Sequence, residues 1–302
     1  MKTAIKYISA AFAVFLAVSI IGGITTAAVE LVDNFFITEE MRDGKAGTEG
    51  SFLGVFGTKK REVSTRDYEY GEENVKILNI EAGIENLSIK EGKELKVEMI
   101  NADVDYEVYF ENKELTIKAP STGFFFGWLF NPKEKGEINI TIPKGTTLEK
   151  LYLDAGVGYV GVEKIKSEQT EINSGTGAFI ANDSDFGLTN IDVGTGKLEL
   201  KDVKLKDAKI DGGTGSLSIK GELLGDTEID CGTGSVTVII AGDIEEYTIG
   251  GDKGTGAFRV EDGNEEIKMS RNSEYDFYYK GSRSSNTLEV SSGTGGVSII
   301  FE

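Results

Sequence analysis

Histidine is absent from this 302-residue sequence, and cysteine and tryptophan occur only once each. Histidine is the commonest general base and a usual zinc ligand, so its absence excludes a Ser-His-Asp triad and the usual zinc centres. The single cysteine, Cys231, excludes an intrachain disulfide. The sequence also has no P-loop. We therefore expect a protein that is not an enzyme; a carbohydrate-active β-helix enzyme using paired carboxylates is the remaining catalytic alternative.

Basic residues are scarce relative to acidic ones. The chain has 32 Lys and Arg against 51 Asp and Glu, which gives a formal net charge of −19. An acidic surface repels nucleic acid and anionic lipid, and it keeps a protein soluble. We therefore expect no nucleic-acid partner.

Charged residues are nearly missing from residues 7–32, where Glu30 is the only one. This apolar run is long enough to cross a bilayer. The basic residues in segment 1–6 predict a cytoplasmic N-terminus and a single-pass transmembrane anchor in the cell membrane. A cleaved signal peptide is the alternative, since small residues at 26–28 form a passable cleavage site. Both interpretations place residues 33–302 outside the cytoplasm.

A gap-free 19-residue repeat is the main feature that is present. Each repeat has two glycines two residues apart, with threonine between them in four of the five repeats. The first glycines are Gly156, Gly175, Gly194, Gly213 and Gly232. A fixed period of this length is typical of a solenoid, whose coils bury their apolar faces only by stacking. We expect the glycines to form a corner that needs positive φ or close backbone contact.

The residues after each corner alternate between apolar and polar, as in Leu198-Glu199-Leu200. Alternation with a period of two is a strand pattern that buries the leucines and exposes the glutamate. Coils of this length fit two or three short strands, stacked about 4.8 Å apart with parallel hydrogen bonding. The sequence predicts an all-β fold, a single extracytoplasmic β-solenoid over 67–302, with regular repeats over 153–247. It follows a linker, 33–66, that is rich in glycine and charge.

The pattern continues towards the C-terminus, where Gly254-Thr255-Gly256 and Gly293-Thr294-Gly295 repeat the corner. The 39-residue interval between these two corners is about two coils long. We therefore expect one degenerate coil over residues 267–286 and irregular ends that cap the solenoid. Cys231 falls in a column of small residues, which predicts a buried filler.

Two files of polar side chains along the coils are candidates for binding. A ladder two residues before the corner glycines consists of Asp154, Asn173, Asp192, Asp211 and Asp230. Two interpretations of the ladder stay open: weak calcium sites, since calcium takes oxygen ligands, or side chains that bond the backbone of their own corners. A second file holds Thr176, Thr195, Thr214 and Thr233. Its hydroxyls either bond within the corner or contact ordered water or sugar.

A third candidate is an aromatic loop that contains the only tryptophan and lies between two proline-containing turns. Its aromatic residues are Phe124, Phe125, Phe126, Trp128 and Phe130. Such a loop either covers the open end of the solenoid or contacts the membrane or a protein partner.

The segment Ile138–Thr146 reads INITIPKGT and leads into the glycine-cornered coils. With the repeated I-D-x-G-T-G-x-L-x-L pattern, it resembles the bacterial "putative adhesin" family of β-strand-repeat domains of unknown function, over roughly residues 75–302. The resemblance implies an exported or membrane-anchored domain and supplies no catalytic residues.

These observations predict a membrane-anchored, non-enzymatic module of the cell surface or envelope that binds a wall or surface ligand. The alternative is an envelope-stress or signalling accessory protein that binds another membrane protein through the aromatic loop or the anchor.

Overall fold

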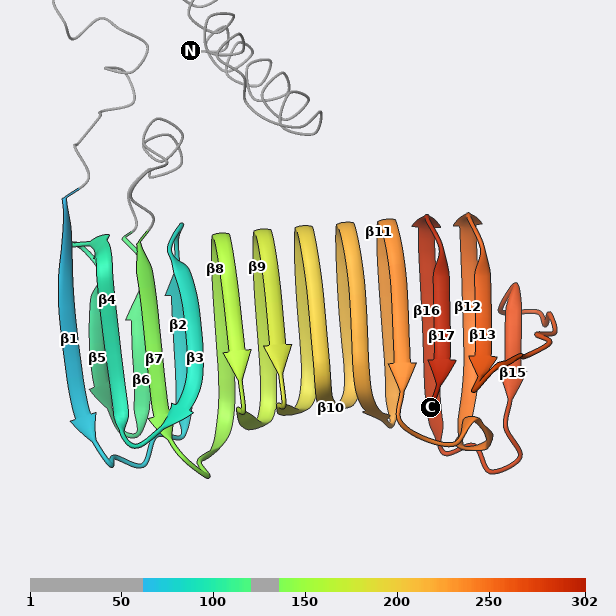
Figure 1. Cartoon of the computed structure of the whole chain (residues 1–302), viewed down its shortest axis with the longest axis horizontal. Helices are drawn as coiled ribbons and strands as arrows, with labels where there is room; N and C mark the ends of the chain where they lie inside the picture. Colours follow the sequence, from blue (N-terminus) through green and yellow to red (C-terminus); the bar gives the residue numbers. More distant parts are fainter. Residues whose placement is uncertain (1–61, 121–135) are drawn as a thin grey trace, which may run out of the picture. The chain divides into compact units, whose positions relative to one another are not determined.

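The computed structural model describes residues 62–120 and 136–302. These residues belong to one compact unit, Arg61–Glu302, built almost wholly of strands (Figure 1). In the described part of the chain, no helix is long and apolar enough to span a bilayer. The predicted anchor, residues 7–32, lies outside the described residues, as does most of the predicted linker. The all-β prediction is confirmed.

Four long strands form the regular coils. They are β8 (Thr147–Glu163), β9 (Lys166–Asn182), β10 (Asp185–Leu224) and β11 (Asp226–Ile240). Each strand bends at its glycine corner and continues, and β10 makes two coils. Neighbouring coils pair in parallel with an offset of one repeat, for example Ile172 with Ile191 and Thr176 with Thr195. The predicted 19-residue stacking is therefore present.

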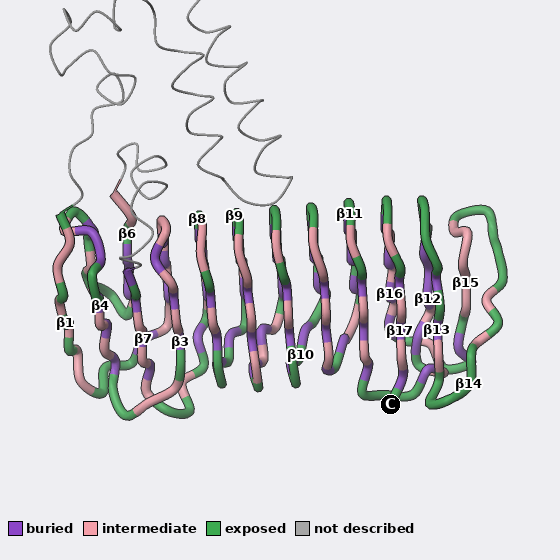
Figure 2. Tube along the Cα trace, turned by 45° about the horizontal axis from the view of Figure 1, so that its top comes forward, coloured by how far each residue is buried: buried purple, intermediate pink, exposed green. Residues whose placement is uncertain are grey.

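The core lies between the two faces of the flattened coils, because alternate side chains point inward. Leu198 and Leu200 are 0% and 1% exposed, whereas Glu199 between them lies on the outer face. In Figure 2, buried and less buried stretches alternate along the coils, and the corners are exposed. Burying one such leucine stabilises the fold by about 1.5–3 kcal/mol, so the inward columns are the main stabilising feature. Cys231 is buried, as predicted.

Irregular strands end the solenoid on its N-terminal side. The first coil, β2 (Ile77–Ala82) and β3 (Asn86–Gly92), stacks on β8. Beyond it, β6 (Glu114–Lys118) and β7 (Glu137–Pro143) add parallel strands. Antiparallel strands complete this end: β1 (Val63–Gly71), β4 (Leu95–Asp103) and β5 (Glu107–Glu111). The rings of Tyr70 and Phe110, 5.3 Å apart, meet across the end of the core.

The C-terminal coils are not stacked in chain order. The last coil is β16 (Asn286–Thr294) with β17 (Val297–Phe301), and the coil before it in the chain is β12 (Tyr247–Thr255) with β13 (Phe258–Asp262). The last coil pairs in parallel with β11 on one side and with β12 and β13 on the other. Figure 1 shows β16 and β17 between β11 and β12. The C-terminal coil is thus inserted into the stack.

The prediction of one degenerate coil over residues 267–286 is wrong. This segment lacks the G-x-G corner of the coils, and it forms the outer edge of the solenoid by antiparallel pairing. Two short strands, β14 (Glu265–Glu266) and β15 (Phe277–Lys280), pair antiparallel with β13 and β12. Phe277 stacks on Phe258 with ring centroids 4.6 Å apart, which covers the end of the core.

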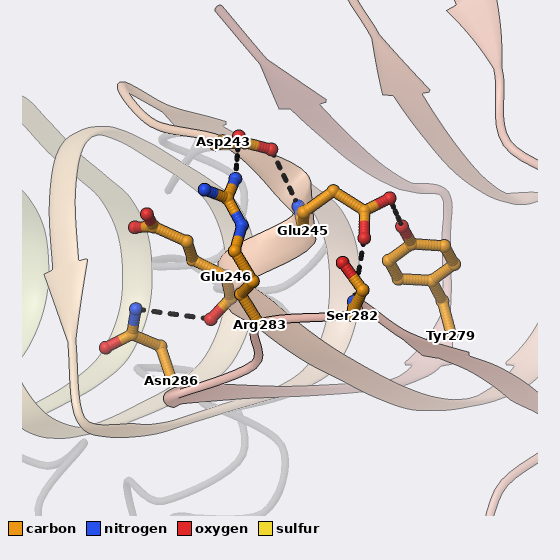
Figure 3. Close-up of polar contacts among 7 residues, drawn as sticks. All are labelled: Asp243, Glu245, Glu246, Tyr279, Ser282, Arg283 and Asn286. Carbon is orange, nitrogen blue, oxygen red and sulfur yellow. Dashed lines mark hydrogen bonds and ion pairs between the residues drawn. The ribbon is translucent and has the colours of Figure 1, made fainter.

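A polar network joins the two connections that pass the inserted coil, one from β11 to β12 and one from β15 to β16 (Figure 3). The crossing from β11 to β12 contains the 3-10 helix η3 (Ile244–Glu246), whose N-cap Asp243 accepts from the Glu245 backbone at 2.9 Å. The Glu245 carboxylate accepts from the Ser282 backbone at 2.7 Å and from Tyr279 Oη at 3.0 Å. The hydrogen bond from the Ser282 backbone is the main reason why the pKa of the Glu245 carboxyl group is lowered. These contacts hold the β15–β16 connection against η3.

Candidate binding surfaces

The two glycines of each corner are required for different reasons. At the second glycine the backbone has positive φ, +141° at Gly196 and +148° at Gly215. A Cβ on Gly215 would lie 1.6 Å from the carbonyl oxygen of Gly196 in the preceding coil. At the first glycine φ lies outside the left-handed region, yet a Cβ on Gly213 would lie 2.3 Å from the Gly194 oxygen. The corner is therefore almost bare backbone.

Threonine side chains project from this bare corner in a continuous row, which we call the threonine ridge. Parallel pairing aligns neighbouring members from coil to coil. In spatial order they are Thr176, Thr195, Thr214, Thr233, Thr294 and Thr255, and all are exposed. Among the hydrogen bonds of residues 62–120 and 136–302, none involves a hydroxyl of the ridge. The ridge hydroxyls can therefore form hydrogen bonds with solvent or a ligand.

The predicted aspartate ladder lies on the outer face beside the ridge. Asp154 pairs with Asn173, Asn173 with Asp192, and Asp211 with Asp230. Within the described part of the chain, no hydrogen bond joins these side chains to their own corners, and no group of three or more His, Cys, Asp or Glu side chains is arranged to hold a metal ion. The structure brings the ladder together as expected, and calcium binding by it stays a prediction.

The aromatic loop, with Phe124, Phe125, Phe126, Trp128 and Phe130, lies outside the described residues. In the chain it falls between β6 and β7. Its proposed contacts stay predictions.

One surface was missed by the sequence reasoning. On the outer face of the C-terminal coils, the rings of Tyr275 and Tyr278 are parallel to within 2°, with centroids 6.4 Å apart. Tyr275 Oη donates to the Glu289 carboxylate. The only sequence signal is an aromatic-rich run at 275–279 that lacks the repeat pattern.

The Toastrack DUF4097 family matches residues 75–300. The chain belongs to the Toastrack DUF4097 family. This assignment confirms the resemblance seen in the INITIPKGT segment and the glycine-cornered coils. The matched residues span the Toastrack domain from β2 to β17, including the threonine ridge, the ladder and the paired tyrosines.

Solved structures similar to this Toastrack chain have low sequence identity. A "putative cell adhesion protein" from Clostridium sporogenes is 19% identical with a TM-score of 0.40, covering 80% of this chain and 100% of that chain. A "putative adhesin" from Bacteroides fragilis is 12% identical with a TM-score of 0.36, covering 79% and 97%. One from Parabacteroides merdae is 11% identical with a TM-score of 0.32, covering 78% and 96%. No curated protein matches the chain.

Proposed function

We propose that the protein is a non-enzymatic binding module of the cell envelope. In this proposal, residues 7–32 hold it in the membrane as a single-pass anchor and the Toastrack domain is displayed on the extracytoplasmic side. The observation that carries the proposal is the threonine ridge, six exposed side chains aligned across stacked coils. The proposed partner is a ligand of the cell wall or cell surface.

The spacing of the ridge supports this role. Stacked strands repeat about every 4.8 Å, so each coil offers the same hydroxyl to a ligand at a fixed interval. One hydroxyl contact is weak, but contacts that are made together on a rigid scaffold add avidity without new chemistry. Extended surfaces of this kind are what solenoids provide. A polymeric ligand therefore suits the ridge better than a small metabolite.

The chemistry of the described residues supports a binding role over catalysis. A catalytic centre needs a nucleophile or base inside a concave, water-excluding site. The chain has no histidine, and its one cysteine is buried. Burial raises the pKa of the Cys231 thiol, which disfavours the reactive thiolate.

Sedimentation with purified cell walls tests the proposal. The full-length protein in detergent is mixed with walls of the source organism, and bound and free fractions are measured over a concentration series, with calcium and with a chelator. The proposal expects saturable binding, and the ladder hypothesis adds a calcium dependence. If the protein does not bind walls and crosslinks to another membrane protein, the result favours the accessory role and contradicts the proposal.

A further inference from the structure

The outer face at the C-terminal end carries a built aromatic surface. Gly250 in β12 has no side chain, and the ring of Tyr275 lies over it. A Cβ built on Gly250 would lie 2.8, 2.8 and 2.9 Å from Cε2, Cζ and Cε1 of Tyr275. Because three consecutive ring atoms are about equally near, the face of the ring covers the glycine. The opposite face of the Tyr275 ring is therefore turned away from the sheet.

Tyr278 extends this surface. It lies opposite Gly250 in the antiparallel pairing of β12 with β15, so its side chain is on the same face of the sheet. Its ring is parallel to that of Tyr275, and both side chains are half-buried. We call the two rings the tyrosine platform.

The tyrosine platform is held in place before any ligand arrives. The Tyr275 backbone NH donates to Asn272 Oδ1 at 2.7 Å, and its Oη donates to Glu289. Burial, and then the Glu289 bond, raise the pKa of Tyr275, so the hydroxyl stays protonated and remains a donor. The Tyr278 backbone exchanges two hydrogen bonds with Ser270, at 2.8 and 2.9 Å. A surface fixed in this way loses little conformational entropy on binding.

A shallow hollow of about 460 Å³ lies further along β12 and β16, two residues beyond Gly250 and Glu289. Asp230, Ser291 and Asp252 line it as register neighbours on β11, β16 and β12, and Cys231, Ser292 and three corner glycines complete the lining. One strand position and one hydrogen bond connect the hollow with the platform segment. Glu289, the acceptor of Tyr275 Oη, lies two residues before Ser291 in the same strand, and Asp252 Oδ1 accepts from the Asp276 backbone at 2.9 Å.

The combination of flat rings and carboxylates selects the ligand chemistry. A pyranose ring has apolar C–H faces that pack on aromatic rings, and hydroxyl edges that donate to carboxylate and serine oxygens. Asp230, Asp252 and Glu289 disfavour an anionic ligand, as does the net charge of −19. An uncharged sugar therefore fits better than a phosphate-bearing or nucleic-acid ligand.

We propose that the tyrosine platform and the adjoining hollow bind consecutive pyranose units of an uncharged glycan. This proposal rests on the proposed function as an envelope binding module and adds a ligand class and a site to it. One pyranose stacks on the tyrosine platform, and the hydroxyls of the neighbouring unit reach Asp230, Ser291 and Asp252.

Calorimetry with defined oligosaccharides tests the site. The full-length protein is kept in a detergent without a sugar headgroup and titrated with chitotetraose, cellotetraose and mannotetraose, with tetragalacturonate as an anionic control. We expect at least one uncharged probe to bind and the anionic probe not to bind. Tyr275→Ala or Tyr278→Ala should weaken that binding at least about tenfold. Tyr109→Ala, at a 38% exposed tyrosine on the N-terminal side, is the matched control and should leave it unchanged.

A second variant protects the test against misfolding of the edge. Gly250→Ala keeps both tyrosines and displaces the Tyr275 ring, so it should also weaken binding while circular dichroism stays unchanged. Equal binding by wild type and all three variants would overturn the proposal, as would no binding of any uncharged probe. If the sugar titrations give either of these results but the wild type still sediments with walls, the proposed function stands without the glycan site. If the wild type does not sediment with walls either, both proposals fail.

Discussion

Gly215→Ala should destabilise the Toastrack domain by about 3–5 kcal/mol. Two costs combine at this position. A side chain at φ +148° is strained by about 1–3 kcal/mol. The new Cβ would also lie 1.6 Å from the Gly196 oxygen, so the coils would have to separate by about 2 Å to reach ordinary contact. That shift breaks backbone hydrogen bonds between coils, each with a net value of about 1 kcal/mol.

Two controls separate these costs. Gly263 has φ +59° and nothing within 4 Å of its Cβ, so Gly263→Ala carries backbone strain alone, about 1–2 kcal/mol. Gly213 has φ outside the left-handed region but a Cβ contact of 2.3 Å, so Gly213→Ala carries the collision alone. Urea unfolding followed by circular dichroism gives the free energy of unfolding of each variant. If Gly215→Ala costs no more than Gly263→Ala, the close stacking at the corner is wrong.

Three further predictions concern the core. Leu198→Asp buries an unpaired charge and should lower the free energy of unfolding by several kcal/mol. Glu199→Ala on the outer face should change it by less than about 0.5 kcal/mol. Similar values for both variants would contradict the assignment of Leu198 to the inner face and Glu199 to the outer face. Burial, helped by nearby carboxylates, raises the pKa of Tyr247 from 10.0 to about 12. A raised pKa in the folded state gives stability that is complete below pH 10 and lost as the pH rises towards about 12, roughly 2–3 kcal/mol. Tyr247→Phe should remove this alkaline loss in denaturation curves taken between these pH values, and an unchanged slope would refute the assignment. Cys231 is 3% exposed, so a thiol reagent should modify it only as fast as the domain opens, and rapid modification under native conditions would contradict its burial.

The regular coils could be predicted because their signal is local and repeated. Alternation around Leu198 specifies the face of the strand, and the glycine pairs specify the corner. The structure then explains the two glycines separately, which the sequence could not do, since strain at Gly215 and collision at Gly213 depend on the neighbouring coil.

The inserted C-terminal coil could not be predicted from the repeat pattern. β12 and β16 carry the same corner motif, so either one satisfies the parallel register beside β11. The stacking order of the C-terminal coils is instead associated with side chains outside the repeat pattern. Asn286 accepts from the Gly225 backbone at 2.9 Å and donates to the Glu246 carbonyl at 3.4 Å, which joins the inserted coil to the β10–β11 turn and to the β11–β12 connection.

The positions of the candidate site residues were predicted better than their interactions. The ladder and the threonine file are in register as expected, because one repeat length fixes both. Hydrogen bonds from the ladder or threonine side chains to their own corners are absent among the described residues. The tyrosine platform was not predicted because Tyr275 and Gly250 meet only after the edge segment folds back on β12.

The most direct test of the binding role compares wall sedimentation of the wild type with a ridge variant. The full-length protein carrying Thr195→Val, Thr214→Val and Thr233→Val loses three aligned hydroxyls and keeps the shape of the side chains. A control with Thr65→Val and Thr147→Val changes exposed threonines elsewhere. We expect the ridge variant to bind purified walls at least about tenfold more weakly and the control to bind like wild type. Identical saturation curves for all three proteins would contradict the role of the threonine ridge.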